Sequence, residues 1–176
     1  MAISKCAVIG AGVMGGGIAA QIANAGVKVT LLDIVPKNAN DRNAIAAGAI
    51  EKMLKTEPAP FMSPRAARLI TPGNIEDDLG RLADCDWIVE AVLEKIEIKH
   101  ATYDKIAKVR KAGSIVSSNT STIPLKDLTA GLPDAFTRDF LITHFFNPPR
   151  YMRLLEIVTG PKTDAAAVTA IDEFCD

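Results

Sequence analysis

Cysteine, histidine and aromatic residues are scarce in this sequence, and neither sign of charge predominates. Three cysteines and two histidines offer few ligands for a metal site, and no two cysteines form a C-x-x-C pattern. The cysteines, Cys6, Cys85 and Cys175, are odd in number and far apart, which is typical of reduced thiols in a protein core and not of a disulfide scaffold. We therefore expect a cytoplasmic protein without a metal site.

The near balance of charge argues against a dedicated nucleic-acid-binding protein. The chain carries 20 Lys and Arg residues against 21 Asp and Glu residues, whereas nucleic-acid-binding domains are usually basic. Hydrophobic residues make up 48% of the chain and charged residues 23%, which excludes a disordered segment and indicates a globular domain. A chain of 176 residues can bury its own core, so one domain over residues 1–176 is predicted.

One uncharged stretch has the length of a membrane span but not its composition. Twenty residues from Val8 to Val27 carry no charge, and that length could cross a bilayer. The stretch also contains six glycines, Gln21 and Asn24, which weaken a helix and would place polar groups in lipid. We expect no membrane segment.

Short apolar runs alternate with segments of helical periodicity along the chain. Gly26 and Gly113 follow two of the helical segments, a position that glycine favours. Because the apolar runs are nearly continuous, we expect an α/β protein with a doubly wound, mostly parallel sheet, helices on both faces and a helical excursion after the second strand. The predicted strands cover residues 6–10, 27–33, 86–92, 114–119, 140–146 and 154–158, and the predicted helices cover residues 13–25, 41–56, 63–69, 94–111 and 164–174.

A glycine-rich turn connects the first predicted strand to the first predicted helix. Gly10, Ala11, Gly12, Val13, Met14 and Gly15 form the pattern G-x-G-x-x-G. In this context Gly10 permits the tight turn, Gly12 lets a pyrophosphate approach the backbone, and Gly15 permits close packing of helix on strand. The helix N-terminus supplies free N–H groups to the phosphates. A Rossmann-type nucleotide site is predicted, although glycines used only for packing would give the same pattern.

An acidic residue closes the second predicted strand. Asp33 lies 23 residues after Gly10, where a carboxylate can accept hydrogen bonds from the hydroxyls of the adenine ribose. A carboxylate there would repel the additional phosphate of NADP. The sequence therefore favours NAD as the cofactor, with a loop-capping role for Asp33 as the alternative.

Four ordered motifs resemble the NAD-binding domain of the 3-hydroxyacyl-CoA dehydrogenases. They are the glycine-rich run at 8–15, the run I-V-E-A-V-L-E at 88–94, S-N-T-S at 118–121, and H-F-F-N-P at 144–148 with Glu156 twelve residues after His144. The run at 147–152 is more similar to multifunctional enzymes of fatty-acid β-oxidation. Members of this family continue beyond the equivalent of residue 176 with a helical domain, so the resemblance implies a segment of a longer, homo-oligomeric protein.

The resemblance assigns catalysis to His144, with Glu156 orienting it and Ser121 near the substrate hydroxyl. The residues support this role independently, because Glu156 interrupts an apolar run and a buried carboxylate needs a partner such as His144. Imidazole titrates near neutrality and can accept a hydroxyl proton. A structural His–Glu pair is the alternative, and for Ser121 the alternative is a helix N-cap.

The resemblance also places Glu94, Lys99, Ser121 and Asn147 against the nicotinamide half of the cofactor. Without it, Glu94 and Lys99 would be a solvated helix start. The implied substrate is an acyl-CoA that carries an L-3-hydroxyl group. The helical excursion at 41–69 holds candidate phosphate contacts in Lys52, Lys55, Arg65 and Arg68, with ordinary solvated charges as the alternative. Two alternative functions remain open. The chain could belong to a dehydrogenase of free hydroxy acids or sugar acids, or to a non-catalytic NAD-binding scaffold.

Overall fold

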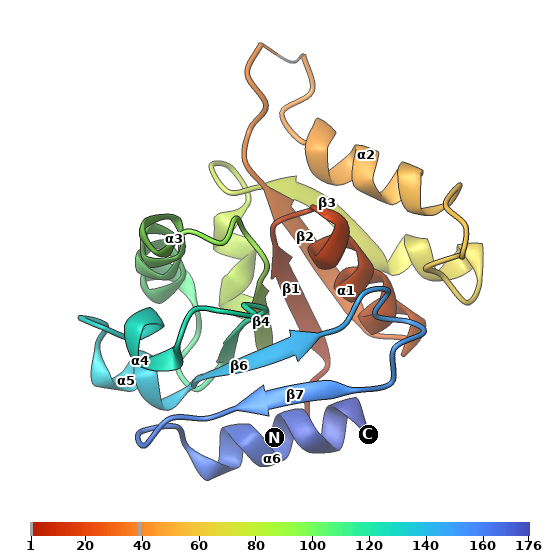
Figure 1. The fold of residues 1–176 in the computed structure, drawn as a ribbon. Coiled ribbons are helices and arrows are strands. Elements are labelled where there is room, and N and C mark those ends of the chain that lie inside the picture. The colour runs from red at the N-terminus through yellow and green to blue at the C-terminus, as the bar shows by residue number, and fades with distance from the viewer. Residues whose placement is uncertain (1, 39) are drawn as a thin grey trace.

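A seven-stranded sheet forms the centre of the molecule (Figure 1), whose computed structural model describes residues 2–38 and 40–176. The strand order is β3-β2-β1-β4-β5-β6-β7. The first six strands are parallel and β7 runs antiparallel to β6. This confirms the predicted mostly parallel sheet. The strands are β1 (Lys5–Ile9), β2 (Lys28–Asp33), β3 (Ile70–Asn74), β4 (Trp87–Glu90), β5 (Ile115–Ser118), β6 (Phe140–Phe145) and β7 (Leu155–Val158).

Helices cover both faces of the sheet. The helices α1, α2 and α6 and the 3-10 helix η1 share one hydrophobic core, while α3, α4, α5 and the 3-10 helix η2 share the other. Figure 1 shows α2 on the side of β2 and β3, and α6 beside β7. The helices are α1 (Val13–Asn24), α2 (Ala44–Met53), α3 (Ile96–Val109), α4 (Leu125–Leu128), α5 (Asp134–Arg138), α6 (Ala165–Cys175), η1 (Pro64–Leu69) and η2 (Leu79–Asp84).

The two cores follow from the alternation of side chains along each strand. In β1, Cys6 and Val8 face the core of α1, whereas Ala7 and Ile9 face the core of α3. All four are fully or almost fully buried, which explains why the strand is continuously apolar. Burial of a side chain such as Ile9 contributes about 1.5–3 kcal/mol.

The edge strand β3 and the short helices η2, α4 and α5 were not predicted. Pro72 and Gly73 lie inside β3, and both residues disfavour a strand interior. Proline is tolerated here because β3 has a neighbour, β2, on one side only. The helix predicted over residues 63–69 is a 3-10 helix, and Ser63 caps it, since its side chain accepts a hydrogen bond from the Arg65 N–H.

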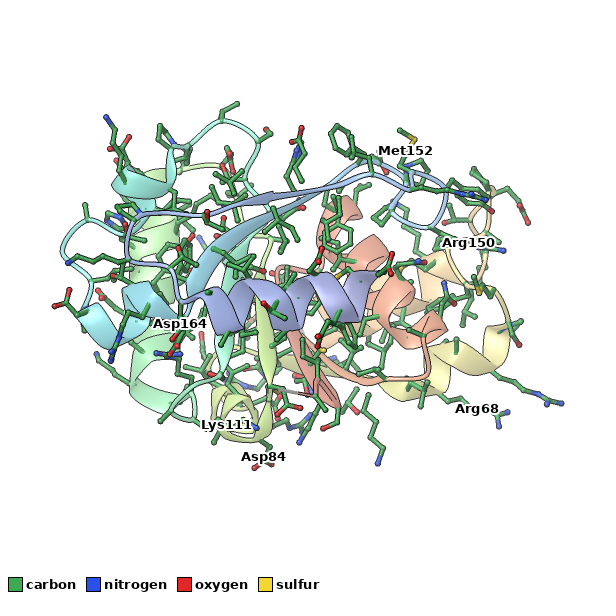
Figure 2. The ribbon with its side chains drawn as sticks, turned by 90° about the horizontal axis from the view of Figure 1, so that it is seen from below. Arg68, Asp84, Lys111, Arg150, Met152 and Asp164 are labelled. Atoms are coloured by element: carbon green, nitrogen blue, oxygen red, sulfur yellow. The ribbon has the colours of Figure 1, made fainter. Side chains whose placement is uncertain are left out.

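The last helix crosses beneath the sheet, as Figure 2 shows from below. Asp164 caps it by accepting a hydrogen bond from the Ala166 N–H at 2.9 Å. Cys6 and Cys85 are buried free thiols, as predicted, whereas Cys175 near the end of α6 is exposed. Within the described residues, no helix is long and apolar enough to span a membrane, and no group of three or more acidic, histidine or cysteine side chains could hold a metal ion.

Candidate functional site

The glycine-rich turn lies where the order of the strands reverses. Strand β1 is hydrogen-bonded to β2 on one side and to β4 on the other, and ligands of open α/β sheets bind at the carboxyl ends of the strands at such a point. Gly10 adopts a φ of 103°. A Cβ atom on Gly10 would lie 2.4 Å from the Ala91 carbonyl oxygen, which follows β4. The fold itself therefore requires glycine at this position.

Packing within the protein requires glycine at position 15 but not at position 12. A Cβ atom on Gly15 would lie 1.8 Å from the Gly10 carbonyl oxygen, so close packing of α1 on the turn demands glycine. A Cβ atom on Gly12 would meet no protein atom within 4 Å, and its φ of −69° suits any residue. Because no side chain among residues 2–38 and 40–176 caps the N-terminus of α1, its first N–H groups are available to a ligand. The turn thus fits a dinucleotide pyrophosphate over Gly12.

Asp33 ends β2 beside this turn. Its Oδ2 atom accepts a hydrogen bond from the Ala11 N–H at 2.5 Å, and its Oδ1 atom accepts one from the Ile34 N–H at 2.7 Å. The carboxylate is therefore fixed next to the glycine-rich turn, as the sequence predicts. Both the ribose-binding role and the loop-capping role are compatible with these contacts.

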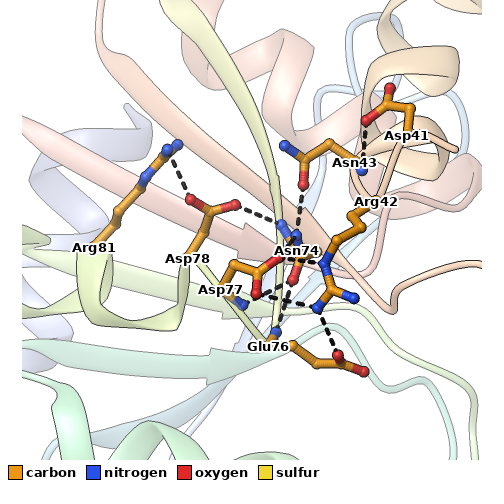
Figure 3. Close-up of polar contacts among 8 residues, drawn as sticks. All are labelled: Asp41, Arg42, Asn43, Asn74, Glu76, Asp77, Asp78 and Arg81. Atoms are coloured by element: carbon orange, nitrogen blue, oxygen red, sulfur yellow. Dashed lines mark hydrogen bonds and ion pairs between the residues drawn. The ribbon is translucent and has the colours of Figure 1, made fainter.

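A cluster of polar side chains fastens the chain before α2 to the end of β3 (Figure 3). The Arg42 guanidinium donates to Asp77 at 2.6 Å and to Glu76 at 2.8 Å. The hydrogen bond from Arg42 and a second from Asn74 hold the pKa of the Asp77 carboxyl below its usual value. Asn74 is the register partner of Asp33 and donates to Asn43 at 2.6 Å. The cluster therefore borders the Asp33 end of the site.

His144 and Glu156 face each other across the antiparallel strands β6 and β7. They are direct register partners, and His144 Nδ1 lies 2.8 Å from Glu156 Oε2. The predicted pairing is confirmed, but the premise of a buried carboxylate is wrong. The Glu156 side chain is 52% exposed and that of His144 is 21% exposed, because β7 forms the edge of the sheet and its far side is open.

Ser121 lies in the loop after β5, which contacts the strand of His144. The Asn119 side-chain oxygen accepts a hydrogen bond from the Phe145 N–H at 2.9 Å. The predicted alternative of Ser121 as a helix N-cap is wrong, because α4 begins after Pro124 and the Ser121 side chain is exposed. Thr120 instead accepts a hydrogen bond from the Ile123 N–H at 3.0 Å.

Glu94 and Lys99 do not form a solvated helix start. Lys99 is 1% exposed, and its ammonium lies 2.8 Å from Glu90 Oε1 and 3.2 Å from Glu94 Oε2. Glu94 is 39% exposed and therefore remains open to a ligand. Glu90 was not singled out from the sequence. An acidic residue at the end of the apolar strand W-I-V-E is the signal that could have identified it.

A cavity of about 420 Å³ connects the glycine-rich turn to the helical excursion and to the segment after His144. Gly12, Asn147, Lys52 and Arg150 all line it. Of the four candidate phosphate contacts, only Lys52 belongs to this lining. Arg150 fastens the segment to the excursion by donating to the Phe61 carbonyl at 2.9 Å. The structure thus brings together the turn, Asn147 and one of the predicted cations.

Comparison with known proteins decides the family. Residues 5–176 match the model of the 3-hydroxyacyl-CoA dehydrogenase, NAD-binding domain. The chain belongs to this family. It is 51% identical over its whole length to a 3-hydroxyacyl-CoA dehydrogenase of Deinococcus radiodurans, and 52% identical over 172 residues to a fatty acid oxidation complex trifunctional enzyme of Rickettsia felis. The structure of 3-hydroxybutyryl-CoA dehydrogenase from Escherichia coli matches 99% of the chain with a TM-score of 0.84 at 27% identity.

These relatives are longer than the present chain. It spans 51% of the Deinococcus protein, 24% of the Rickettsia protein and 36% of the Escherichia coli chain. Membership of the family therefore establishes the kind of domain, and the fold confirms the predicted Rossmann-type architecture.

Proposed function

We propose that this chain is the NAD-binding domain of an NAD-dependent L-3-hydroxyacyl-CoA dehydrogenase that oxidises the 3-hydroxyl group of an acyl-CoA. The observation that carries the proposal is the His144–Glu156 pair, whose atoms lie 2.8 Å apart in a sheet that also carries a glycine-rich turn suited to a dinucleotide. A purely structural pair on an exposed edge strand would add little stability.

The cofactor half of the site uses the glycine-rich turn and the end of β2. NAD, when bound, supplies the acceptor for the hydride from C3 of the substrate. Gly12 and the N-terminus of α1 would hold its pyrophosphate, and Asp33 its adenine ribose. We assign the nicotinamide half to Ser121, Asn147 and Glu94. Asn147 and Glu94 are open to a ligand, and Asn147 lines the same cavity as Gly12.

His144 is the proposed base. With the Nδ1–H donating to Glu156, the Nε2 atom keeps its lone pair and can accept the proton of the substrate hydroxyl. The hydroxyl thus loses its proton to His144 and C3 loses its hydride, which leaves a 3-ketoacyl product. The Glu156 carboxylate then stabilises the imidazolium.

The cavity supports a CoA ester as the substrate. Its lining contains Lys52 and Arg150 but no acidic residue, and phosphate groups favour such a surface. We propose that the rest of the acyl pocket belongs to the segments by which the relatives exceed this chain, and that the complete enzyme is a cytoplasmic homo-oligomer.

Replacement of His144 tests the proposal. In the intact protein, with a 3-hydroxyacyl-CoA and NAD, His144→Ala should lower kcat by about 10²–10⁴-fold and leave the Kd for NADH within about twofold. His100→Ala is the matched control, since His100 lies on α3 and its ring nitrogen contacts the Asp127 carbonyl, at 2.9 Å, on α4.

An unchanged kcat in His144→Ala, or an equal loss in His100→Ala, would contradict the assignment of the base. Turnover of free 3-hydroxybutyrate as efficient as that of its CoA ester would contradict the CoA substrate. Binding of NADH without turnover of either compound by the intact protein would indicate a scaffold.

A further inference from the structure

A fully buried ion pair lies at the carboxyl ends of β4 and β5. Glu90, the last residue of β4, is 0% exposed, and its Oε1 atom lies 2.8 Å from the Lys99 ammonium on α3. The same atom accepts a hydrogen bond from the Val92 N–H at 2.9 Å. The Oε2 atom accepts from the Tyr103 hydroxyl at 2.6 Å and from the Ser118 hydroxyl at 2.7 Å. Every acceptor position of the carboxylate is thus used within the protein.

Stability alone does not explain this arrangement. Desolvation of two charges is so unfavourable that well-packed apolar residues of similar volume usually serve a core as well or better. Burial and the neighbouring Glu90 carboxylate raise the pKa of Tyr103 far above its usual value, so its hydroxyl remains a donor. The Glu90 carboxylate is therefore held by donors on all sides, although the proposed proton transfer uses neither Glu90 nor Lys99.

The Lys99 ammonium also connects the buried carboxylate to one that faces solvent. It lies 3.2 Å from Glu94 Oε2 and 3.4 Å from the Ser118 hydroxyl, so all three of its protons have partners. Partial burial acts to raise the pKa of Glu94, but the contacts with Thr120 and Lys99 outweigh it, and the pKa lies below its usual value. Glu94 therefore stays ionised beside Lys99.

Glu94 in turn holds the loop that carries Ser121. Its Oε1 atom accepts hydrogen bonds from the Thr120 hydroxyl and, at 3.2 Å, from the Thr122 hydroxyl. Because the Thr120 hydroxyl donates to Glu94, its lone pairs point to the backbone, where it accepts from the Ile123 N–H at 3.0 Å. Ser121 lies between the two threonines that Glu94 binds.

We propose that Lys99 is a positioning residue: its ammonium, anchored by Glu90, fixes Glu94 and thereby the loop that presents Ser121 beside the strand of His144. The cofactor contact that the resemblance implies for Lys99 stays a separate prediction. The positioning role rests on the proposed function for the importance of Ser121, but not for the connection itself, which amide exchange can measure without cofactor or substrate.

Three variants separate positioning from plain stabilisation. Lys99→Met leaves two carboxylates without their cation, and it should lower the Tm and speed exchange of the Ile123 amide about tenfold. Glu90→Gln with Lys99→Met leaves no unpaired charge in the core, so the Tm should recover while fast exchange at Ile123 persists. Glu94→Ala keeps the buried pair, and it should speed exchange at Ile123 with little change in Tm. Lys105→Met, on the exposed side of the same helix, is the control and should change neither quantity.

In the intact enzyme the double variant should also lose about tenfold in kcat, since small displacements of reacting groups have effects of this size. If amide exchange at Ile123 were slow again in the double variant, the Glu90–Lys99 pair would only stabilise the fold, and the proposal would be overturned. Wild-type exchange in Lys99→Met or in Glu94→Ala would also overturn it. A wild-type enzyme that fails to oxidise 3-hydroxyacyl-CoA would contradict the proposed function instead, while the exchange measurements would still decide the role of Lys99.

Discussion

Replacing the two glycines at the start of α1 by alanine should have different effects. Gly15→Ala should lower the stability of the fold, whereas Gly12→Ala should lower the affinity for the cofactor. In Gly15→Ala the new Cβ atom would lie 1.8 Å from the Gly10 carbonyl oxygen, whereas ordinary contacts begin at 3.4 Å. The helix must therefore move away from the turn by about 1.6 Å. Forced overpacking of this kind destabilises by about 1–3 kcal/mol or more, and the better helix propensity of alanine, about 1 kcal/mol, offsets only part of it. We expect a net loss of about 2 kcal/mol and a Tm lower by about 4–8 °C.

In Gly12→Ala the new Cβ atom would meet no protein atom within 4 Å. The loss of unfolded-chain entropy favours alanine by about 0.4–1 kcal/mol, and the preference of the N-cap position for glycine works in the other direction by a similar amount. The Tm should stay within about 2 °C of the wild type. The same Cβ atom would occupy the space that we assign to the pyrophosphate, so the Kd for NADH should rise at least about tenfold, or 1.4 kcal/mol.

Differential scanning fluorimetry without ligand and titration with NADH by nucleotide fluorescence measure the two effects separately. Wild-type affinity in Gly12→Ala would place the pyrophosphate elsewhere. A loss of Tm in Gly12→Ala equal to that in Gly15→Ala would refute the distinction between a glycine that the fold requires and one that a ligand requires.

Two further predictions concern segments that support the site. Burial acts to raise the pKa of Asp86, but hydrogen bonds from Lys111, Ser4 and Lys5 outweigh it and hold the pKa far below its usual value. This stabilisation is complete above pH 4, the approximate unfolded value, and is lost as the pH falls further. Asp86→Asn should therefore destabilise the protein by about 2 kcal/mol at pH 7, and denaturant titrations should show the difference shrinking below pH 4; a constant difference would refute the cause. Arg150→Ala removes the donor to the Ala59 and Phe61 carbonyls, so limited proteolysis should cut residues 57–62 faster than in an Arg68→Ala control, and equal rates would show that Arg150 does not hold that segment.

Much of the fold follows from local sequence signals, and the exceptions have physical causes. Continuous apolar runs identify β1, β2, β4, β5 and β6 because both faces of a parallel sheet are covered. The antiparallel edge strand β7 was also predicted from its apolar run, although none of its residues is fully buried. β3 escapes this reasoning because its Pro72 and Gly73 are tolerated only at a sheet edge, and whether a strand lies at an edge is settled by the tertiary fold. The four-residue α4 and five-residue α5 are too short to show a helical period.

Some features of the site could likewise be predicted from local sequence, whereas others depend on the tertiary fold. The glycine-rich turn and the pairing of His144 with Glu156 could be predicted, since one is a local pattern and the other a polar interruption in two apolar strands. The exposure of Glu156 could not, because it depends on β7 being the last strand. The burial of Lys99 was also missed. A lysine at the start of a helix is usually solvated, and only the tertiary structure shows that the end of β4 places Glu90 against it.

The residues that we assign to the reaction differ from their neighbours in whether contacts within the protein explain their identity. Gly10 and Gly15 are explained by close backbone contacts within the protein. Gly12 and Asn147 satisfy no comparable demand, because the first faces open space and the second is exposed at the same cavity. A ligand that fills this cavity supplies the missing reason for both. The buried pair of Glu90 and Lys99 is the intermediate case, since its charges are unfavourable for the core but hold an exposed carboxylate in place. We therefore expect the residues that act in the reaction to be those whose identity the fold alone does not require.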